Sequence, residues 1–206
     1  MSYSLDEQST LLSIALDSIN SGLHHGKPAH PNSADYSTSL AAQRACFVTL
    51  KHDETLRGCI GTLEARSSLV ESIADNAYAA AFSAPRFPAL DASEDEHLTN
   101  EISVLSPMEP VSVTSEQELL DKMIPGDAGW VLQENGHRGT FLPSVWASLG
   151  KPAEFLQQLK MKAGLTPDYW SDTLQIWRYT TDAFAAAATG IEPSGRGSPN
   201  AGQAPA

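Results

Sequence analysis

The chain has 206 residues, with 13 Lys and Arg against 25 Asp and Glu, which gives a formal net charge of −12. Because binding to nucleic acid depends mainly on cations that displace counterions from phosphates, this charge argues against a DNA- or RNA-binding protein. No stretch approaches the ~20 apolar residues of a membrane span, and no basic segment followed by an apolar run opens the chain, so we expect a cytoplasmic protein that does not enter a membrane.

The cysteine and histidine content argues against disulfides and metal sites. Cys46 and Cys59 are too few for a disulfide framework and fit a reducing compartment. The adjacent pair His24 and His25 is badly placed for chelation, and no set of four ligands has the spacing of a zinc site. We therefore expect no metal.

The first predicted element is a helix. Ser4 and Glu7 form a capping box, apolar residues follow at spacings of three and four, and Gly22 and Gly26 end the pattern. Residues 26–41 are rich in Pro, Ser, Asn and Ala, so we expect a long surface loop there.

A hairpin and a second helix come next. Residues 45–50 predict a strand, residues 51–55 a polar turn, and Leu56 begins the return strand. A second capping box at residues 68–71 opens an alanine-rich helix that ends before Pro85.

The second half alternates short strands and helices. We expect an acidic turn or helix opened by Ser93, strands at 101–105, 130–133, 139–142 and 174–179, and helices at 115–123, 144–149 and 152–163. Asn135 and Gly136 predict a tight hairpin. The strand ending at Tyr179 closes the folded body. We expect one domain over residues 1–186, followed by a disordered Ala/Gly/Pro/Ser-rich tail at 187–206.

No regular strand–helix–strand repeat indicates a parallel sheet. We therefore predict an α+β fold with antiparallel-rich sheets and packed helices.

The most unusual stretch is Leu56–Gly61, LRGCIG. Two glycines bracket a cysteine in a segment that otherwise favours a strand, which indicates a bulge, a positive φ, or a close approach by a ligand or another backbone. Strand alternation places Arg57 and Cys59 on one face. An arginine beside a thiol favours the thiolate, so Cys59 is a candidate nucleophile. The alternative is a packed cysteine that acts as a small hydrophobe, and no histidine is placed by the sequence to act as its base.

Arg86 and Phe87 lie between Pro85 and Pro88. Rigid flanks suit an arginine that binds an anion. The alternative is a helix-ending loop whose Phe87 anchors in the core.

Several motifs, in order, resemble the AMMECR family. They are CFVTL at 46–50, LRGCIGTL at 56–63, NA and AAAF within 76–82, PRFP at 85–88, EISVLSP at 101–107, GTFLPSVW at 139–146, and AGL and YW within 163–170. The resemblance runs from about residue 8 to 185. It implies an α+β fold of two intimately associated lobes, with LRGCIG in the cleft between them.

Cleft positions carried over from the family are Arg57, Gly58, Cys59, Gly61, Asn76, Arg86, Phe87, Glu101 and Pro143. Ala84 departs from the family, which usually has aspartate there. Bacterial members are named AmmeMemoRadiSam system protein A, which implies association with Memo-like and radical SAM proteins but names no reaction or cofactor. We expect a cleft that binds a small anionic ligand or peptide. A Cys59-dependent enzyme and a non-catalytic regulatory scaffold stay open as alternatives.

Overall fold

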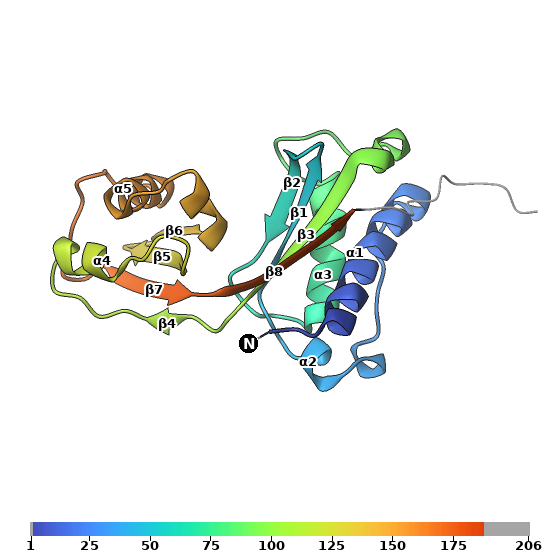
Figure 1. The fold of residues 1–206 in the computed structure, drawn as a ribbon, viewed down its shortest axis with the longest axis horizontal. Helices are drawn as coiled ribbons and strands as arrows, with labels where there is room; N and C mark the ends of the chain where they lie inside the picture. The colour runs from blue at the N-terminus through green and yellow to red at the C-terminus, as the bar shows by residue number, and fades with distance from the viewer. Residues whose placement is uncertain (1, 188–206) are drawn as a thin grey trace, which may run out of the picture.

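The computed structural model describes residues 2–187, apart from the side chains at 92, 95 and 96. It forms two lobes joined by two crossings of the chain (Figure 1). Lobe 1 holds residues 2–105 and 181–187, and lobe 2 holds residues 106–180. Each lobe is built on its own antiparallel four-stranded sheet, so the predicted α+β class is confirmed.

Sheet 1, in lobe 1, has the strand order β2-β1-β3-β8. Its strands are β1 (Cys46–His52), β2 (Thr55–Gly61), β3 (Leu98–Leu105) and β8 (Thr181–Ala187). Helices α1 (Leu5–His25) and α3 (Leu69–Phe82) cover one face, and the other face is turned toward lobe 2 (Figure 1). Three short helices complete the lobe: η1 (Ser33–Asp35), α2 (Thr38–Ala41) and η2 (Ala92–His97).

Both long helices begin where their capping boxes predict. Ser4 caps α1 and Ser68 caps α3, and in each case the Glu three residues later bonds back to the cap backbone. Gly26 ends α1 with φ +67, a conformation that favours glycine.

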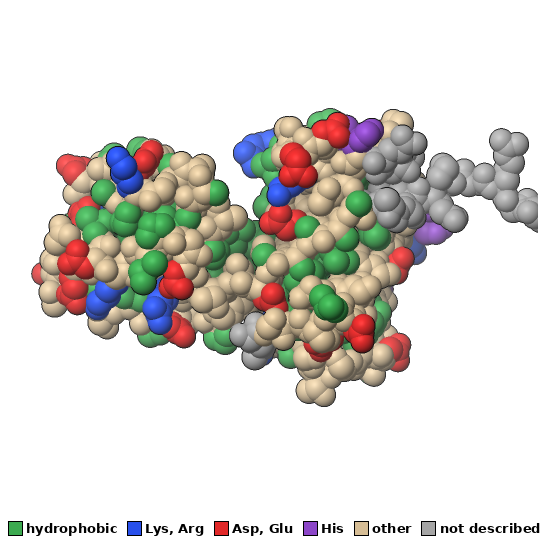
Figure 2. Space-filling view, viewed as in Figure 1, with side chains coloured by type: hydrophobic (Ala, Val, Ile, Leu, Met, Phe, Trp, Pro, Cys, Tyr) green, Lys and Arg blue, Asp and Glu red, His purple; other side chains and the backbone are tan. Residues whose placement is uncertain are grey.

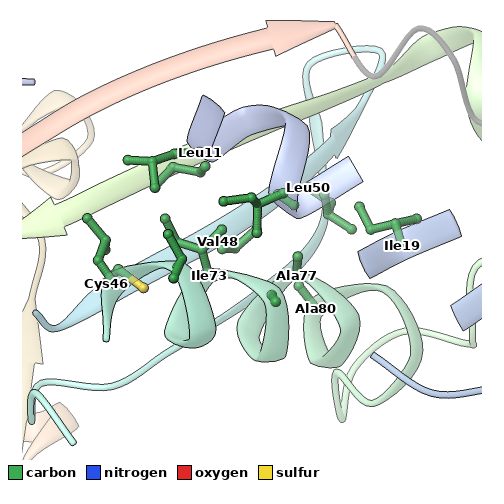
Figure 3. Close-up of a cluster of buried hydrophobic side chains, with 14 of the residues drawn as sticks. Leu11, Ile19, Cys46, Val48, Leu50, Ile73, Ala77 and Ala80 are labelled. Carbon is green, nitrogen blue, oxygen red and sulfur yellow. The ribbon is translucent and has the colours of Figure 1, made fainter. Parts of the chain in front are cut away.

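The core of lobe 1 fills the space between the helices and sheet 1. Alternate residues of β1, Cys46, Val48 and Leu50, are 0% exposed and point toward the helices (Figure 3). Ala77 and Ala80 of α3, also 0% exposed, provide the small side chains that let the helix approach the sheet closely.

Lobe 2 packs three helices around sheet 2, whose strand order is β4-β7-β5-β6. The strands are β4 (Glu109–Pro110), β5 (Gly129–Glu134), β6 (His137–Phe141) and β7 (Gln175–Tyr179), and the helices are α4 (Glu116–Lys122), η3 (Pro143–Ala147) and α5 (Pro152–Lys162). Asn135 (φ +47) and Gly136 (φ +84) form the predicted hairpin turn.

The two crossings of the chain between the lobes are bonded to each other. Ser106 N donates to Thr180 O (2.9 Å), and Thr180 N donates to Ser106 Oγ (3.0 Å). Beside them a small apolar cluster joins the lobes. Its buried members are Ala45, Leu105, Val131 and Tyr179. An ion pair between Arg138 and Glu64 (3.4 Å) also spans the junction.

Three sequence predictions about the fold need correction. The folded body does not end at Tyr179, because β8 continues to Ala187 and pairs with β3 along its whole length. Residues 26–41 are not loop throughout, since η1 and α2 lie in them. The hairpin turn after β1 contains only Asp53 and Glu54, both with positive φ. The predicted tail, apart from Ala187, lies outside the described residues.

Candidate functional site

A groove separates the two lobes on the side where sheet 1 lacks helices (Figure 2). We call it the inter-lobe groove. The side chains assigned to it are Thr49, Lys51, Cys59, Arg86, Glu101 and Lys162. Sheet 1 provides Thr49, Lys51, Cys59 and Glu101. Arg86 comes from the α3–η2 loop, and Lys162 from the end of α5 in lobe 2.

A β-bulge shapes the central motif. Gly58 pairs with Leu50 and Leu56 pairs with Lys51, so Arg57 is an extra residue on β2. The predicted departure from regular pairing is therefore confirmed. Arg57 and Cys59 have different partners, Glu94 for the guanidinium and Thr49 for the thiol.

Arg57 is neutralised by a residue that sequence spacing did not reveal. Its Nε donates to Glu94 Oε2 (2.7 Å) and its Nη2 to Glu94 Oε1 (3.0 Å). The Arg57 side chain is only 9% exposed. This hydrogen bonding raises the pKa of Arg57 and lowers the pKa of Glu94, so both stay charged. The charge of the guanidinium is thus already paired with a carboxylate, while its buried Nη1 has no hydrogen-bond partner among the described residues.

Cys59 lies in a row of polar side chains that crosses three strands. It pairs with Thr49, which in turn pairs with Glu101. Thr49 Oγ1 donates to Cys59 Sγ (3.3 Å), and Lys51 Nζ lies 2.7 Å from Glu101 Oε2. The thiol is partly exposed. It is therefore reachable and held beside a hydroxyl.

Lys162, at the end of α5 in lobe 2, is electrostatically coupled to Cys59 and Arg86 of lobe 1. Lys162 Nζ lies 4.7 Å from the centroid of the Phe141 ring, a cation–π contact that holds the ammonium against lobe 2. Lys162 is an exposed residue, but the protein on one side of its ammonium removes part of its water, which is the first reason that the pKa of Lys162 lies below its ordinary value. The negative form of Cys59 acts in the opposite sense, and the charge of Arg86 lowers the pKa further. The pKa of Lys162 is thus affected by both Cys59 and Arg86 of lobe 1.

The other cysteine lies on the opposite face of sheet 1. Cys46 is fully buried, and burial raises the pKa of its thiol to about 12. Asn76 Nδ2 donates to Cys46 O (3.2 Å) and to Cys46 Sγ (3.3 Å). Asn76 therefore lies on the helix side of the sheet and not in the inter-lobe groove, where the resemblance had implied it.

The two glycines of the motif allow close packing on opposite sides. A Cβ at Gly58 would lie 2.2 Å from the backbone oxygen of Ala80 in α3. A Cβ at Gly61 would lie 2.4 Å from the ring of Phe47. Both positions therefore shape the backbone around Cys59, and neither has a side chain to bind a ligand.

Phe87 and Pro143, which the resemblance placed in the cleft, come from different lobes. Phe87 is half-buried, and Arg86 Cζ lies 5.7 Å from the centroid of its ring. Pro143 is the first residue of η3, which follows β6 directly. The structure records no direct contact of either residue with Cys59.

Sequence reasoning missed Thr49, Glu94 and Lys162. Thr49 could have been found from strand alternation once β1 and β2 were paired. Lys162 had no local signal, because its neighbours in the groove lie in the other lobe. Within residues 2–187, no group of three His, Cys, Asp or Glu side chains is arranged to hold a metal ion. Of the described helices, not one has both the length and the hydropathy of a membrane span.

The chain is similar to known sequences over most of its length. The family model described as AMMECR1 matches residues 12–184. Protein MJ0810 of Methanocaldococcus jannaschii is 36% identical over 164 residues, which cover 78% of this chain and 80% of that protein. Protein MK0488 of Methanopyrus kandleri is 36% identical over 185 residues, which cover 87% of this chain and 88% of that protein.

A solved structure shares the fold. The crystal structure of the uncharacterized protein PH0010 from Pyrococcus horikoshii superposes with a TM-score of 0.79 at 31% sequence identity. The match covers 85% of this chain and 89% of that chain. The names of these three proteins state no activity.

Proposed function

The chain belongs to the AMMECR1 family, and we propose that its inter-lobe groove binds a small anionic ligand or an acidic peptide end. The names of the relatives state no activity, so the proposal is argued from the site itself. The observation that carries this proposal is the position of Lys162. Its ammonium lies 4.7 Å from the centroid of the Phe141 ring in lobe 2 and is electrostatically coupled to Cys59 and Arg86 of lobe 1. A ligand between the lobes would contact cations from both.

The distribution of ion pairs supports the choice of these two cations. Arg57 is paired with Glu94, and Lys51 is paired with Glu101. Among the described residues, neither Lys162 nor Arg86 has a carboxylate partner. Lys162 and Arg86 are both exposed residues, so an anion can reach them from solvent. The groove therefore offers positive charge that the fold itself does not neutralise.

Charge-selective alkylation of Cys59 tests this proposal. Iodoacetate is an anion and iodoacetamide is neutral, but both alkylate a thiol. We expect the iodoacetate/iodoacetamide rate ratio at Cys59 to exceed that of free cysteine by about fivefold, since one unit charge at 4 Å in water contributes ~1 kcal/mol. Cys46 is fully buried and should stay unlabelled in the folded protein. Inorganic phosphate and malonate should slow the labelling of Cys59.

Variants assign the effect to the two cations. Lys162→Met and Arg86→Met should each lower the rate ratio. Lys151→Met is the matched control, because it removes one positive charge from an exposed position, as Lys162→Met does. Lys151 precedes the first residue of α5, whereas Lys162 is the last residue of that helix. A rate ratio at or below that of free cysteine in the wild type would contradict an anion-binding groove.

A second candidate function is cysteine-dependent chemistry at Cys59. The lowered pKa of Lys162 gives it more neutral amine than an ordinary lysine, as a general base needs. In this alternative Lys162 would take the thiol proton, and Arg86 would hold the anionic group of the substrate. Neutral iodoacetamide separates the two functions. A Cys59 that reacts with it no faster than free cysteine at pH 7 counts against catalysis and leaves anion binding intact.

The resemblance alone supports a further alternative, in which the chain acts as a regulatory scaffold with Memo-like and radical SAM proteins. Co-purification from cells that express all three proteins tests it. Failure of either protein to associate at low and moderate salt would count against this alternative.

A further inference from the structure

Lobe 2 contains a pocket that is separate from the inter-lobe groove. It has a volume of about 350 Å³ and lies between the end of α4, the segment around β4, and the neighbouring part of sheet 2. This volume falls within the range of small-molecule sites. Figure 2 shows apolar side chains between positive and negative ones over this part of the left-hand lobe. None of the groove residues lines the pocket.

Trp130 is part of the pocket wall and is only 2% exposed. Its indole N–H is buried and has no hydrogen-bond partner among the described residues. Trp146, in the same hydrophobic cluster, satisfies its own indole N–H with Ala128 O (2.9 Å). An indole N–H can only donate, so Trp130 lacks an acceptor that the fold provides for its neighbour.

The rim of the pocket has apolar and balanced charged parts. Ile124 is 61% exposed, which is unusual for a large aliphatic side chain. Arg178 is paired with Glu109 (2.9 Å), and Lys122 with Glu118 (2.9 Å). The two cations of the lining are matched by its two carboxylates, Glu109 and Asp121, so the pocket offers little net charge to an ionic ligand. This differs from the inter-lobe groove.

We propose that this pocket binds an uncharged small molecule with an apolar body and a carbonyl oxygen, which accepts a hydrogen bond from the Trp130 indole. Burial of the apolar body against Ile124 and the Trp130 ring supplies the main favourable free energy. The carbonyl supplies the acceptor whose absence leaves a buried donor unpaired. The N–H is shielded from bulk water, so the side chains that cover it must move for the acceptor to reach it.

Three cyclohexyl probes test the proposal by nuclear magnetic resonance: neutral cyclohexanone, anionic cyclohexanecarboxylate, and cationic cyclohexylammonium, which has no acceptor. In ¹H–¹⁵N spectra of the full chain, cyclohexanone should shift the Trp130 indole resonance saturably and leave the Trp146 resonance in place. Trp130→Phe assigns the resonance and should weaken cyclohexanone binding about fivefold, the effect of one lost hydrogen bond.

Ile124→Ser changes an exposed residue and therefore tests the site without depending on the fold of Trp130→Phe. It should also weaken cyclohexanone binding. No shift of the Trp130 indole with any probe would overturn the site. Tighter binding of the carboxylate than of the ketone would overturn the uncharged class, and an equal response to cyclohexylammonium would overturn the role of the acceptor.

Discussion

The two faces of sheet 1 are made by alternate residues of the same strands, yet they differ completely. On the helix face, Val48 and Leu50 are 0% exposed. On the groove face, Thr49, Lys51 and Glu101 are polar and partly exposed. The strand register therefore separates the residues that hold the fold from those left for chemistry, and a shift by one residue would exchange the two sets.

The two cysteines repeat this contrast. Cys46 is buried on the helix face beside Asn76, and Cys59 is partly exposed on the groove face beside Thr49. The same residue type thus packs on one side and is reachable on the other.

The largest expected effect comes from a cavity on the helix face. Leu50→Ala should lower the free energy of unfolding by about 3 kcal/mol, because a fully buried side chain is replaced by a void. Urea unfolding followed by circular dichroism measures this change. Thr49→Ala, one residue away on the groove face, should cost less than about 1 kcal/mol. Equal costs at the two positions would remove the proposed division between the faces.

A smaller effect should follow from adding a single methyl group at Gly58. The new Cβ would meet the Ala80 backbone oxygen at 2.2 Å, so α3 or β2 must move. We expect Gly58→Ala to cost about 2 kcal/mol in urea unfolding. Gly150→Ala is the control, since a Cβ there has no neighbour within 4 Å and φ is not positive. If both variants unfold at the same urea concentration, the close contact between α3 and β2 is not a constraint.

The smallest effect concerns the pair that neutralises Arg57. Glu94→Gln should lower the free energy of unfolding by about 1 to 2 kcal/mol near pH 7, because it removes the charged partner of a buried guanidinium. The pKa of Glu94 is lowered in the folded state. Its contribution is therefore fully present above the ordinary carboxyl pKa of 4.5 and is lost as pH falls through the lowered value.

Urea unfolding of the wild type and Glu94→Gln between pH 3 and 7 checks this pH dependence. The difference between the two proteins should stay constant above about pH 5 and shrink below about pH 4. A difference that does not change over this range would mean that the charge of Glu94 contributes nothing to stability.

Local patterns predicted most of the elements. Capping boxes fixed the starts of α1 and α3, and Asn135 with Gly136 fixed the hairpin of sheet 2. By contrast, β8 was missed because its sequence TDAFAAA has weak strand preference. Its pairing with β3 depends on a partner far away in the chain, which a local window does not contain.

The candidate site was less predictable than the fold. The motif around Cys59 and the position of Glu101 could be recognised from the sequence. The side chains that interact with this motif could not. Glu94 pairs with Arg57 across 37 positions of the chain, and Lys162 is coupled to Cys59 from the other lobe. Asn76, conversely, has the residue type of a ligand-binding amide but packs against Cys46.

The crossing at Ser106 and Thr180 has a consequence for the history and engineering of this fold. Leu105 pairs directly with Thr181, so β3 and β8 form a hairpin into which the whole of lobe 2 is inserted. An insertion whose ends are adjacent leaves the host sheet intact. Lobe 1 could therefore be closed by a short turn, or could accept a different guest module, and each such graft would give the thiol of Cys59 a new opposing wall.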